Sequence, residues 1–164
     1  GTGASLSGSS VILAAIDVTD GVDVLAEEVR TEVARLLHSR KNAKLACMTV
    51  LKTKLVGEDE LEDKAGRSVY INRLVELKHW AEPLGLGDEQ VSFHVIEAFD
   101  VANAILNYAA NNDVGHIAIG ARASSALRRH LGSVSAQVVA EALCSVSVVR
   151  VKRIEAQAIG LAEG

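Results

Sequence analysis

The sequence predicts an α/β domain with a five-stranded parallel sheet in the strand order 3-2-1-4-5 and helices on both faces. Three observations predict this doubly wound fold. Five short apolar runs have the length of strands, the segments between them carry apolar residues at helical spacing, and the order of strand then helix repeats along the chain. That repeat is typical of a parallel sheet flanked by helices.

The first strand and helix lie near the start of the chain. Residues 11–16 are an unbroken apolar run that ends at Asp17, as expected of a strand covered on both faces. From Val22 to Leu37, apolar residues recur at steps of three and four, which predicts an amphipathic helix. Residues 1–10 are rich in Gly and Ser, and we interpret them as a linker or an expression scar.

The second and third strands are expected at residues 45–50 and 91–96, and residues 52–64 form a charged loop without periodicity. Asp100 is the predicted N-cap of the helix that follows the third strand. Trp80 is expected in the core or in helix packing. A helix is expected between these strands, and two glycines, Gly85 and Gly87, end it. Its apolar stripe consists of Tyr70, Leu74, Leu77, Ala81 and Leu84.

The composition of the strands predicts their order in the sheet. The fourth strand, residues 116–119, and the first are nearly all apolar, as central strands are, whereas the third and fifth alternate polar and apolar residues. In the order 3-2-1-4-5, a crevice opens between the carboxyl ends of the first and fourth strands. Asp17 and Gly120 fall at this crevice.

The fifth strand, from Val146 to Val151, completes a domain that covers residues 11–151. Its valines form an apolar sheet edge, and such edges pair readily with another chain. The alternative is that the tail, residues 152–164, covers this edge.

The segment after the fourth strand predicts an anion site at the crevice. A basic loop follows Gly120, and the last helix begins near Gly132 and Ser133. A helix start presents unpaired amides with a partial positive charge, and the hydroxyls of Ser133 and Ser135 add donors. Glycines allow phosphate oxygens to approach the backbone closely, and Asp17 can accept from a ribose or a nearby amide. We therefore expect a ligand that carries phosphate.

Together these features resemble the universal stress protein family. The resemblance rests on the first strand ending at Asp17, on the second ending Met48-Thr49-Val50, and on the glycine loop before Gly132-Ser133-Val134-Ser135. It implies an adenine nucleotide alpha-hydrolase-like fold that binds ATP or another adenine nucleotide, with Mg²⁺ as an optional companion. Asp17 and the Val50 backbone then hold the nucleoside, and the phosphate residues are Gly120, Arg122, Gly132, Ser133, Val134 and Ser135, with Ala123 at the place of the family's second glycine.

The resemblance also implies a biological setting. It implies a stress-response regulatory module of the bacterial cytoplasm and a homodimer formed through the last strand. The sequence is similar to modules that follow protein kinase domains in some bacterial polypeptides, so a covalently linked or interacting regulatory domain is an expected partner.

Two departures from the family pattern leave alternatives open. Ala123 replaces a glycine, and eight residues separate it from Gly132. If that position needs a positive φ, the β-carbon costs about 1–2 kcal/mol. One alternative is a dimeric interaction module that binds no nucleotide. The other is a slow ATPase with His130 as its base, although the sequence has neither a Walker lysine nor a nucleophile elbow.

Composition argues against several other classes of function. With 17 Lys and Arg against 21 Asp and Glu, the net charge of −4 provides no general attraction for nucleic acid or anionic lipid. No apolar stretch approaches the roughly 20 residues that span a bilayer. Cys47 and Cys144 do not form a disulfide or zinc pattern, and the five histidines share no metal-ligand spacing. We therefore expect no nucleic-acid, membrane or metal partner.

Overall fold

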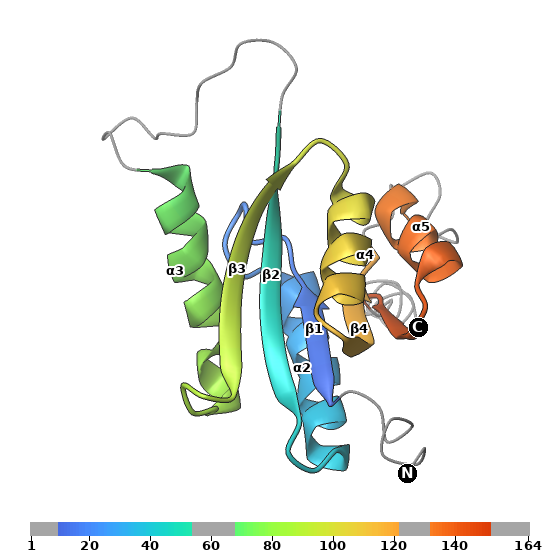
Figure 1. Ribbon diagram of the computed structural model, residues 1–164. Helices are drawn as coiled ribbons and strands as arrows, with labels where there is room; N and C mark the ends of the chain where they lie inside the picture. The colour runs from blue at the N-terminus through green and yellow to red at the C-terminus, as the bar shows by residue number, and fades with distance from the viewer. Residues whose placement is uncertain (1–9, 54–67, 122–131, 152–164) are drawn as a thin grey trace, which may run out of the picture.

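The computed structural model describes residues 10–53, 68–121 and 132–151 (Figure 1). These residues form a parallel sheet in the order β3-β2-β1-β4-β5, which confirms the predicted topology. The strands are β1 Val11–Ala15, β2 Lys44–Lys52, β3 Val91–Ala98, β4 Val114–Gly120 and β5 Ser145–Val149. The helices are α2 Val24–Ser39, α3 Val69–Ala81, α4 Val101–Asn111 and α5 Ser133–Glu141, and a short 3-10 helix, η1, covers Glu82–Leu84.

Side-chain caps start three of the helices. Asp23 accepts from the amide of Ala26 at 2.9 Å and begins α2, and Ser68 caps α3 in the same manner. Asp100 accepts from the amide of Asn103 at 3.0 Å, which confirms the predicted cap of α4. Such acceptors satisfy amides that have no partner within the helix, so α2 begins after Asp23 rather than at Val22.

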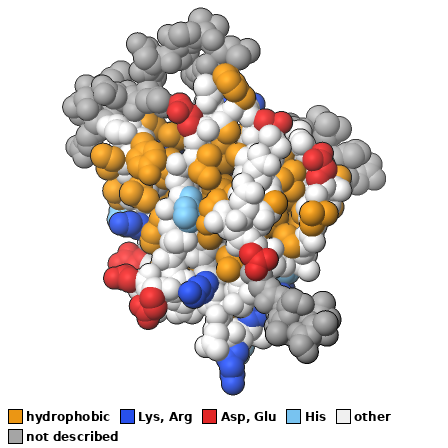
Figure 2. All heavy atoms as spheres, viewed as in Figure 1, with side chains coloured by type: hydrophobic (Ala, Val, Ile, Leu, Met, Phe, Trp, Pro, Cys, Tyr) orange, Lys and Arg blue, Asp and Glu red, His pale blue; other side chains and the backbone are white. Residues whose placement is uncertain are grey.

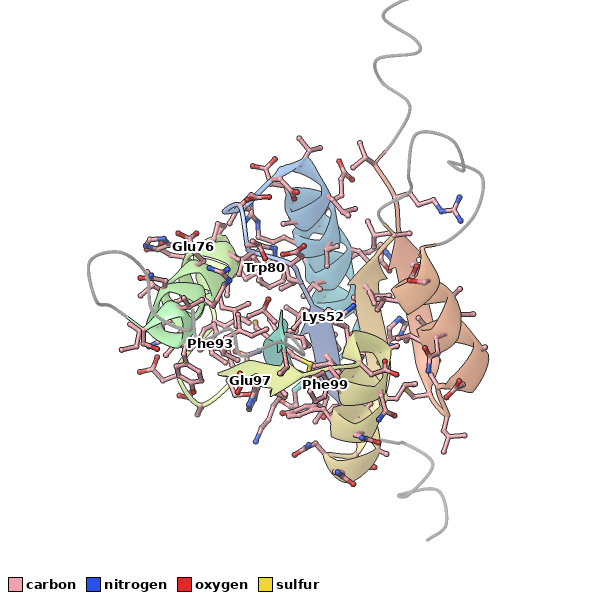
Figure 3. The ribbon with its side chains drawn as sticks, turned by 90° about the horizontal axis from the view of Figure 1, so that it is seen from above. Lys52, Glu76, Trp80, Phe93, Glu97 and Phe99 are labelled. Carbon is pink, nitrogen blue, oxygen red and sulfur yellow. The ribbon has the colours of Figure 1, made fainter. Side chains whose placement is uncertain are left out.

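The helices cover both faces of the sheet. On one face, α2 and α3 pack around a core that includes Val33, Leu45 and Trp80. On the other face, α4 and α5 pack around a core that includes Leu13 and Ile105. Seen from above, these two pairs of helices lie on opposite sides of the strands (Figure 3). The central strand β1 is almost completely buried, whereas β3 and β5 at the two ends of the sheet are partly exposed, as their composition predicted.

Trp80 joins α3 to α2. Its side chain is fully buried, and its indole Nε1 donates to the carbonyl of Ala26 at 2.7 Å (Figure 3). In return, the Arg30 guanidinium donates to the carbonyl of Trp80 at 3.1 Å. The prediction that Trp80 belongs to the core is confirmed, and these two bonds fix the distance between the helices.

The buried face of α3 agrees with the predicted stripe at Leu77 and Ala81, with Leu74 and Leu84 packed against the same core, and differs at Tyr70. Its buried residues are Leu77, Trp80 and Ala81, whereas Tyr70 is 48% exposed. The helix turns its indole inward because an aromatic ring contributes a large apolar area and this one has a hydrogen-bond partner, while the Tyr70 hydroxyl stays near water.

Several strand ends also differ from the prediction by one or two residues, and two of them illustrate the reason. The second strand continues through Lys52, which the sequence placed in a loop, because its pairing with β3 extends as far as Ala98. The last strand ends at Val149 rather than at Val151, since its partner β4 ends at Gly120.

The molecular surface has exposed apolar side chains between charged ones on the face that carries α4 and α5 (Figure 2). In the described part of the chain, Val139 on α5 is 44% exposed, and Leu143, which follows this helix, is 99% exposed. Within that part, no helix is both long enough and apolar enough for a membrane crossing.

Candidate functional site

A cavity of about 650 Å³ lies at the carboxyl ends of the strands, the end toward the viewer in Figure 3. This volume is typical of sites for small molecules. Its lining includes residues from the four described α-helices and from the carboxyl-terminal parts of β1, β2, β3 and β4. The predicted site residues in this lining are Asp17, Val50, Gly120, Gly132, Ser133, Val134 and Ser135. The predicted Arg122 and Ala123, and the candidate base His130, lie outside the described residues.

Asp17 forms the turn that leaves β1. Its carboxylate Oδ1 accepts from the amide of Thr19 at 2.9 Å, and the residue is exposed at the cavity. The turn role and the site role expected for Asp17 are compatible, because each carboxylate oxygen can accept more than one hydrogen bond. Asp17 therefore keeps acceptor capacity for a ligand hydroxyl.

Gly120 ends β4 where the strand meets the side chain of Leu25 from α2. A β-carbon at this position would lie 2.8 Å from Leu25 Cγ and 2.9 Å from its Cδ2. Both residues line the cavity. Packing against Leu25 therefore explains this glycine. The close approach of a ligand, which the sequence predicted, stays a prediction.

The start of α5 forms another wall of the cavity. Gly132 is its N-cap and has no side chain with which to cover the amides. The Ala136 amide makes the first helical bond, to Gly132 O at 2.9 Å, so the amides of Ser133, Val134 and Ser135 precede that bond. These amides and the helix dipole favour an anion at this wall.

The two serines of this helix start differ from each other. Ser133 is exposed, whereas Ser135 is 2% exposed and its hydroxyl donates to the carbonyl of Gly132 at 3.2 Å. We expected both hydroxyls to be donors toward a ligand. In this structure the Ser135 hydroxyl instead stabilises the first turn, because a hydroxyl has one proton to donate.

Sequence reasoning missed the wall formed by β2 and α3. We call this the β2–α3 wall; it consists of Thr49, Leu51, Val69 and Arg73. Thr49 is 4% exposed, and the Nε atom of Arg73 is buried without a hydrogen-bond partner among the described residues. The sequence had a signal for Arg73, since it lies four residues before Leu77 and seven before Trp80. An arginine on the buried face of an amphipathic helix is unusual.

The charged residues that line the cavity balance one another. Lys52 and Arg73 are cations, and Asp17 and Glu97 are anions. Lys52 and Glu97 lie near the centre of the view from above, at the ends of β2 and β3 (Figure 3). Within the described ranges, no three His, Cys, Asp or Glu residues gather as a metal-binding set. The lining therefore provides hydrogen-bonding groups and a helix start, together with apolar surface.

The half-buried histidine of β4, His116, belongs to a separate chain of hydrogen bonds. His116 Nε2 lies 2.7 Å from the Ser147 hydroxyl, which donates to Glu32 at 2.9 Å, and Arg40 lies 3.2 Å from His116 Nδ1. Burial and the Arg40 charge lower the pKa of His116, whereas the hydrogen bond from Arg35 lowers the pKa of Glu32. Since Arg40 can only donate, His116 Nδ1 accepts and Nε2 carries the proton. This chain connects α2 to β5, and we interpret it as structural.

Comparisons with known proteins find relatives of this arrangement. A model of the universal stress protein family matches residues 10–150. The solved structure of a universal stress protein from Archaeoglobus fulgidus is 20% identical, with a TM-score of 0.64, and the match covers 84% of this chain and 96% of that chain. Hypothetical protein MJ0577 is 21% identical, with a TM-score of 0.66 and coverage of 87% and 96%.

A universal stress protein solved in complex with cAMP is 18% identical, with a TM-score of 0.62, and the match covers 88% of this chain and 99% of that chain. At these identities the solved structures establish a shared fold. A search of curated proteins gave no match.

Proposed function

Because the chain belongs to the universal stress protein family, we propose that its cavity binds an adenine nucleotide and that the protein acts as a nucleotide-binding regulatory module. One observation carries this proposal. The described residues that the sequence assigned to the nucleotide site line a single cavity, although Asp17 and Ser135 lie far apart along the chain.

The walls of the cavity match the parts of a nucleotide. The amides at the start of α5 suit the phosphates, and the Asp17 carboxylate suits the ribose hydroxyls. The Val50 backbone and the apolar residues beside it suit the base. We also propose that Arg122 contacts the phosphates, and the family resemblance alone supports this contact. Mg²⁺ enters the proposal only as an ion brought by the phosphates.

A relative supports the chemical class of the ligand. The universal stress protein solved with cAMP has the same fold over 88% of this chain, and its ligand is an adenine nucleotide. We expect the α5 end of the cavity to determine how many phosphates the preferred nucleotide has. Titration with ATP, ADP and AMP measures this preference.

We expect ATP, ADP, AMP or cAMP to bind saturably in isothermal titration calorimetry. Replacing Asp17 by alanine is expected to weaken the binding about tenfold, because a charge-assisted bond to the ribose is lost. The matched control is Asp20→Ala, which removes the same charge from an exposed turn residue outside the cavity lining. Lack of saturable binding to all four nucleotides at millimolar concentration contradicts the proposal. It then favours an interaction module that binds no nucleotide.

The outer strand β5 supports a second proposal, that the protein forms a homodimer through this strand. β5 has a described partner strand, β4, on one side only. The exposed Val139 and Leu143 lie on α5 and just before β5, so apolar surface adjoins the strand. An unpaired edge beside apolar surface favours pairing with a second copy.

Size-exclusion chromatography with light scattering tests the homodimer. We expect a mass of twice the 17.3 kDa chain, and we expect Leu143→Lys to shift the equilibrium toward the monomer. Val75→Lys is the control, because Val75 is an exposed apolar residue on the distant helix α3. A wild-type protein that remains monomeric at high concentration contradicts this assembly.

A further inference from the structure

Arg73 has a buried polar group beside the cavity that the described residues leave unsatisfied. The residue lies on α3, it lines the cavity, and its Nε atom is buried without a hydrogen-bond partner in the described part of the chain. Its position on the helix is fixed by Leu77 and Trp80, which are fully buried four and seven residues later. A buried donor without an acceptor is costly, so this site favours a ligand that brings an acceptor.

The surroundings of Arg73 contain little that competes for this donor. The other residues of the β2–α3 wall are Thr49, Leu51 and Val69, two of which are apolar. Among the described residues, no carboxylate lies within ion-pair distance of the Arg73 guanidinium. Apart from Thr49, the described residues of this wall offer the guanidinium only apolar side chains, and a hydrogen bond in such surroundings is stronger than in water.

The sheet places Arg73 away from the phosphate end of the cavity. α3 packs on β2 and β3, whereas α5 packs on β5 and α4. Because β1 separates β2 from β4, about 10 Å of sheet lies between the two walls. A nucleotide with its phosphates at α5 and its ribose at Asp17 extends its base toward the β2–α3 wall.

We infer that Arg73 binds the base by turning its guanidinium into the cavity and donating its Nε–H to a ring nitrogen of the adenine. This inference rests on the proposed function. Arginine donates to purine ring nitrogens elsewhere, since its N–H groups lie in a plane that matches the edge of the base. Thr49, which is buried in the same wall, is the neighbouring polar side chain.

The test compares two variants of Arg73 with a matched control. Arg73→Met keeps an unbranched side chain that reaches about as far as Nε and removes all the donors. Arg73→Lys keeps the charge and removes the Nε–H. Lys78→Met removes a charge from the exposed side of the same helix, outside the cavity lining. Circular dichroism establishes that each variant is folded before its affinities for ATP, AMP and adenosine are measured by calorimetry.

We expect Arg73→Met and Arg73→Lys each to bind all three ligands about tenfold more weakly, while Lys78→Met binds them as the wild type does. The ratio of ATP to adenosine affinity should stay constant, because the base is common to both. Each of the analogues 1-deaza-, 3-deaza- and 7-deaza-ATP lacks one ring nitrogen, and one of them should bind the wild type about tenfold more weakly than ATP does. The same analogue should bind Arg73→Met as tightly as ATP does.

Three results overturn the inference while leaving the proposed function intact. The first is unchanged ATP affinity in Arg73→Met. The second is a loss for ATP without a loss for adenosine, which indicates a phosphate contact. The third is wild-type binding by Arg73→Lys, which indicates that charge alone acts. By contrast, a wild-type protein that binds none of these ligands contradicts the proposed function itself.

Discussion

Replacing Trp80 by alanine is expected to lower the free energy of unfolding by about 3–5 kcal/mol. The fully buried indole fills the space between α2 and α3, so its removal leaves a cavity in one of the two cores. It also removes the hydrogen bond to the Ala26 carbonyl. Because Trp80 is the one tryptophan of the chain, far-UV circular dichroism during urea unfolding measures the loss in the variant.

Two further variants separate packing from hydrogen bonding at this position. Trp80→Phe keeps an aromatic ring and loses the indole donor, so it should cost clearly less than Trp80→Ala. Tyr70→Ala lies on the same helix at a half-exposed position and should change stability by about 0.5–1 kcal/mol at most. A Trp80→Ala protein as stable as Tyr70→Ala contradicts the assignment of Trp80 to the core.

Replacing Gly120 by alanine is expected to affect both stability and ligand binding. The new β-carbon would meet Leu25 Cγ at 2.8 Å, and such overpacking costs about 1–3 kcal/mol. Leu25 lines the cavity and must move, so the proposed nucleotide should bind at least about tenfold more weakly. Urea unfolding and calorimetric titration measure the two effects separately.

Gly87→Ala is the matched control, since its β-carbon would meet only the flexible carboxylate of Glu89, at 3.2 Å. A second control uses Leu25→Ala, which makes room for the new β-carbon. The double variant should be more stable than the sum of the two single losses predicts. If Gly120→Ala has the same free energy of unfolding and the same nucleotide affinity as the wild type, the prediction is wrong and the close approach of Leu25 has no consequence.

The order of the strands could be predicted because it depends on composition. Apolar residues on both faces distinguish β1 and β4 as central strands, and alternating residues distinguish β3 and β5 as outer strands. The position of Asp17 and Gly120 at one edge follows from this order, since parallel strands end on the same side of a sheet.

The chemistry of single side chains could not be predicted in the same manner. Whether Ser135 donates to a ligand or to Gly132 depends on hydroxyl geometry. The contact of Gly120 with Leu25 joins residues from two distant elements. The exposure of Arg73 to the cavity depends on how α3 rotates to bury Trp80. Each of these results from packing between elements, which periodicity along one element does not contain.

The central place of β1 has a consequence for synthesis of the protein. β1 pairs with β2 on one side, and its other side pairs with β4, so that Val11 aligns with both Lys44 and Val114. As the chain leaves the ribosome, β1, β2 and β3 can associate early, while the far side of β1 waits for β4 to be translated. During this interval the nascent chain presents an apolar strand with one unpaired edge, and such an edge is prone to aggregation.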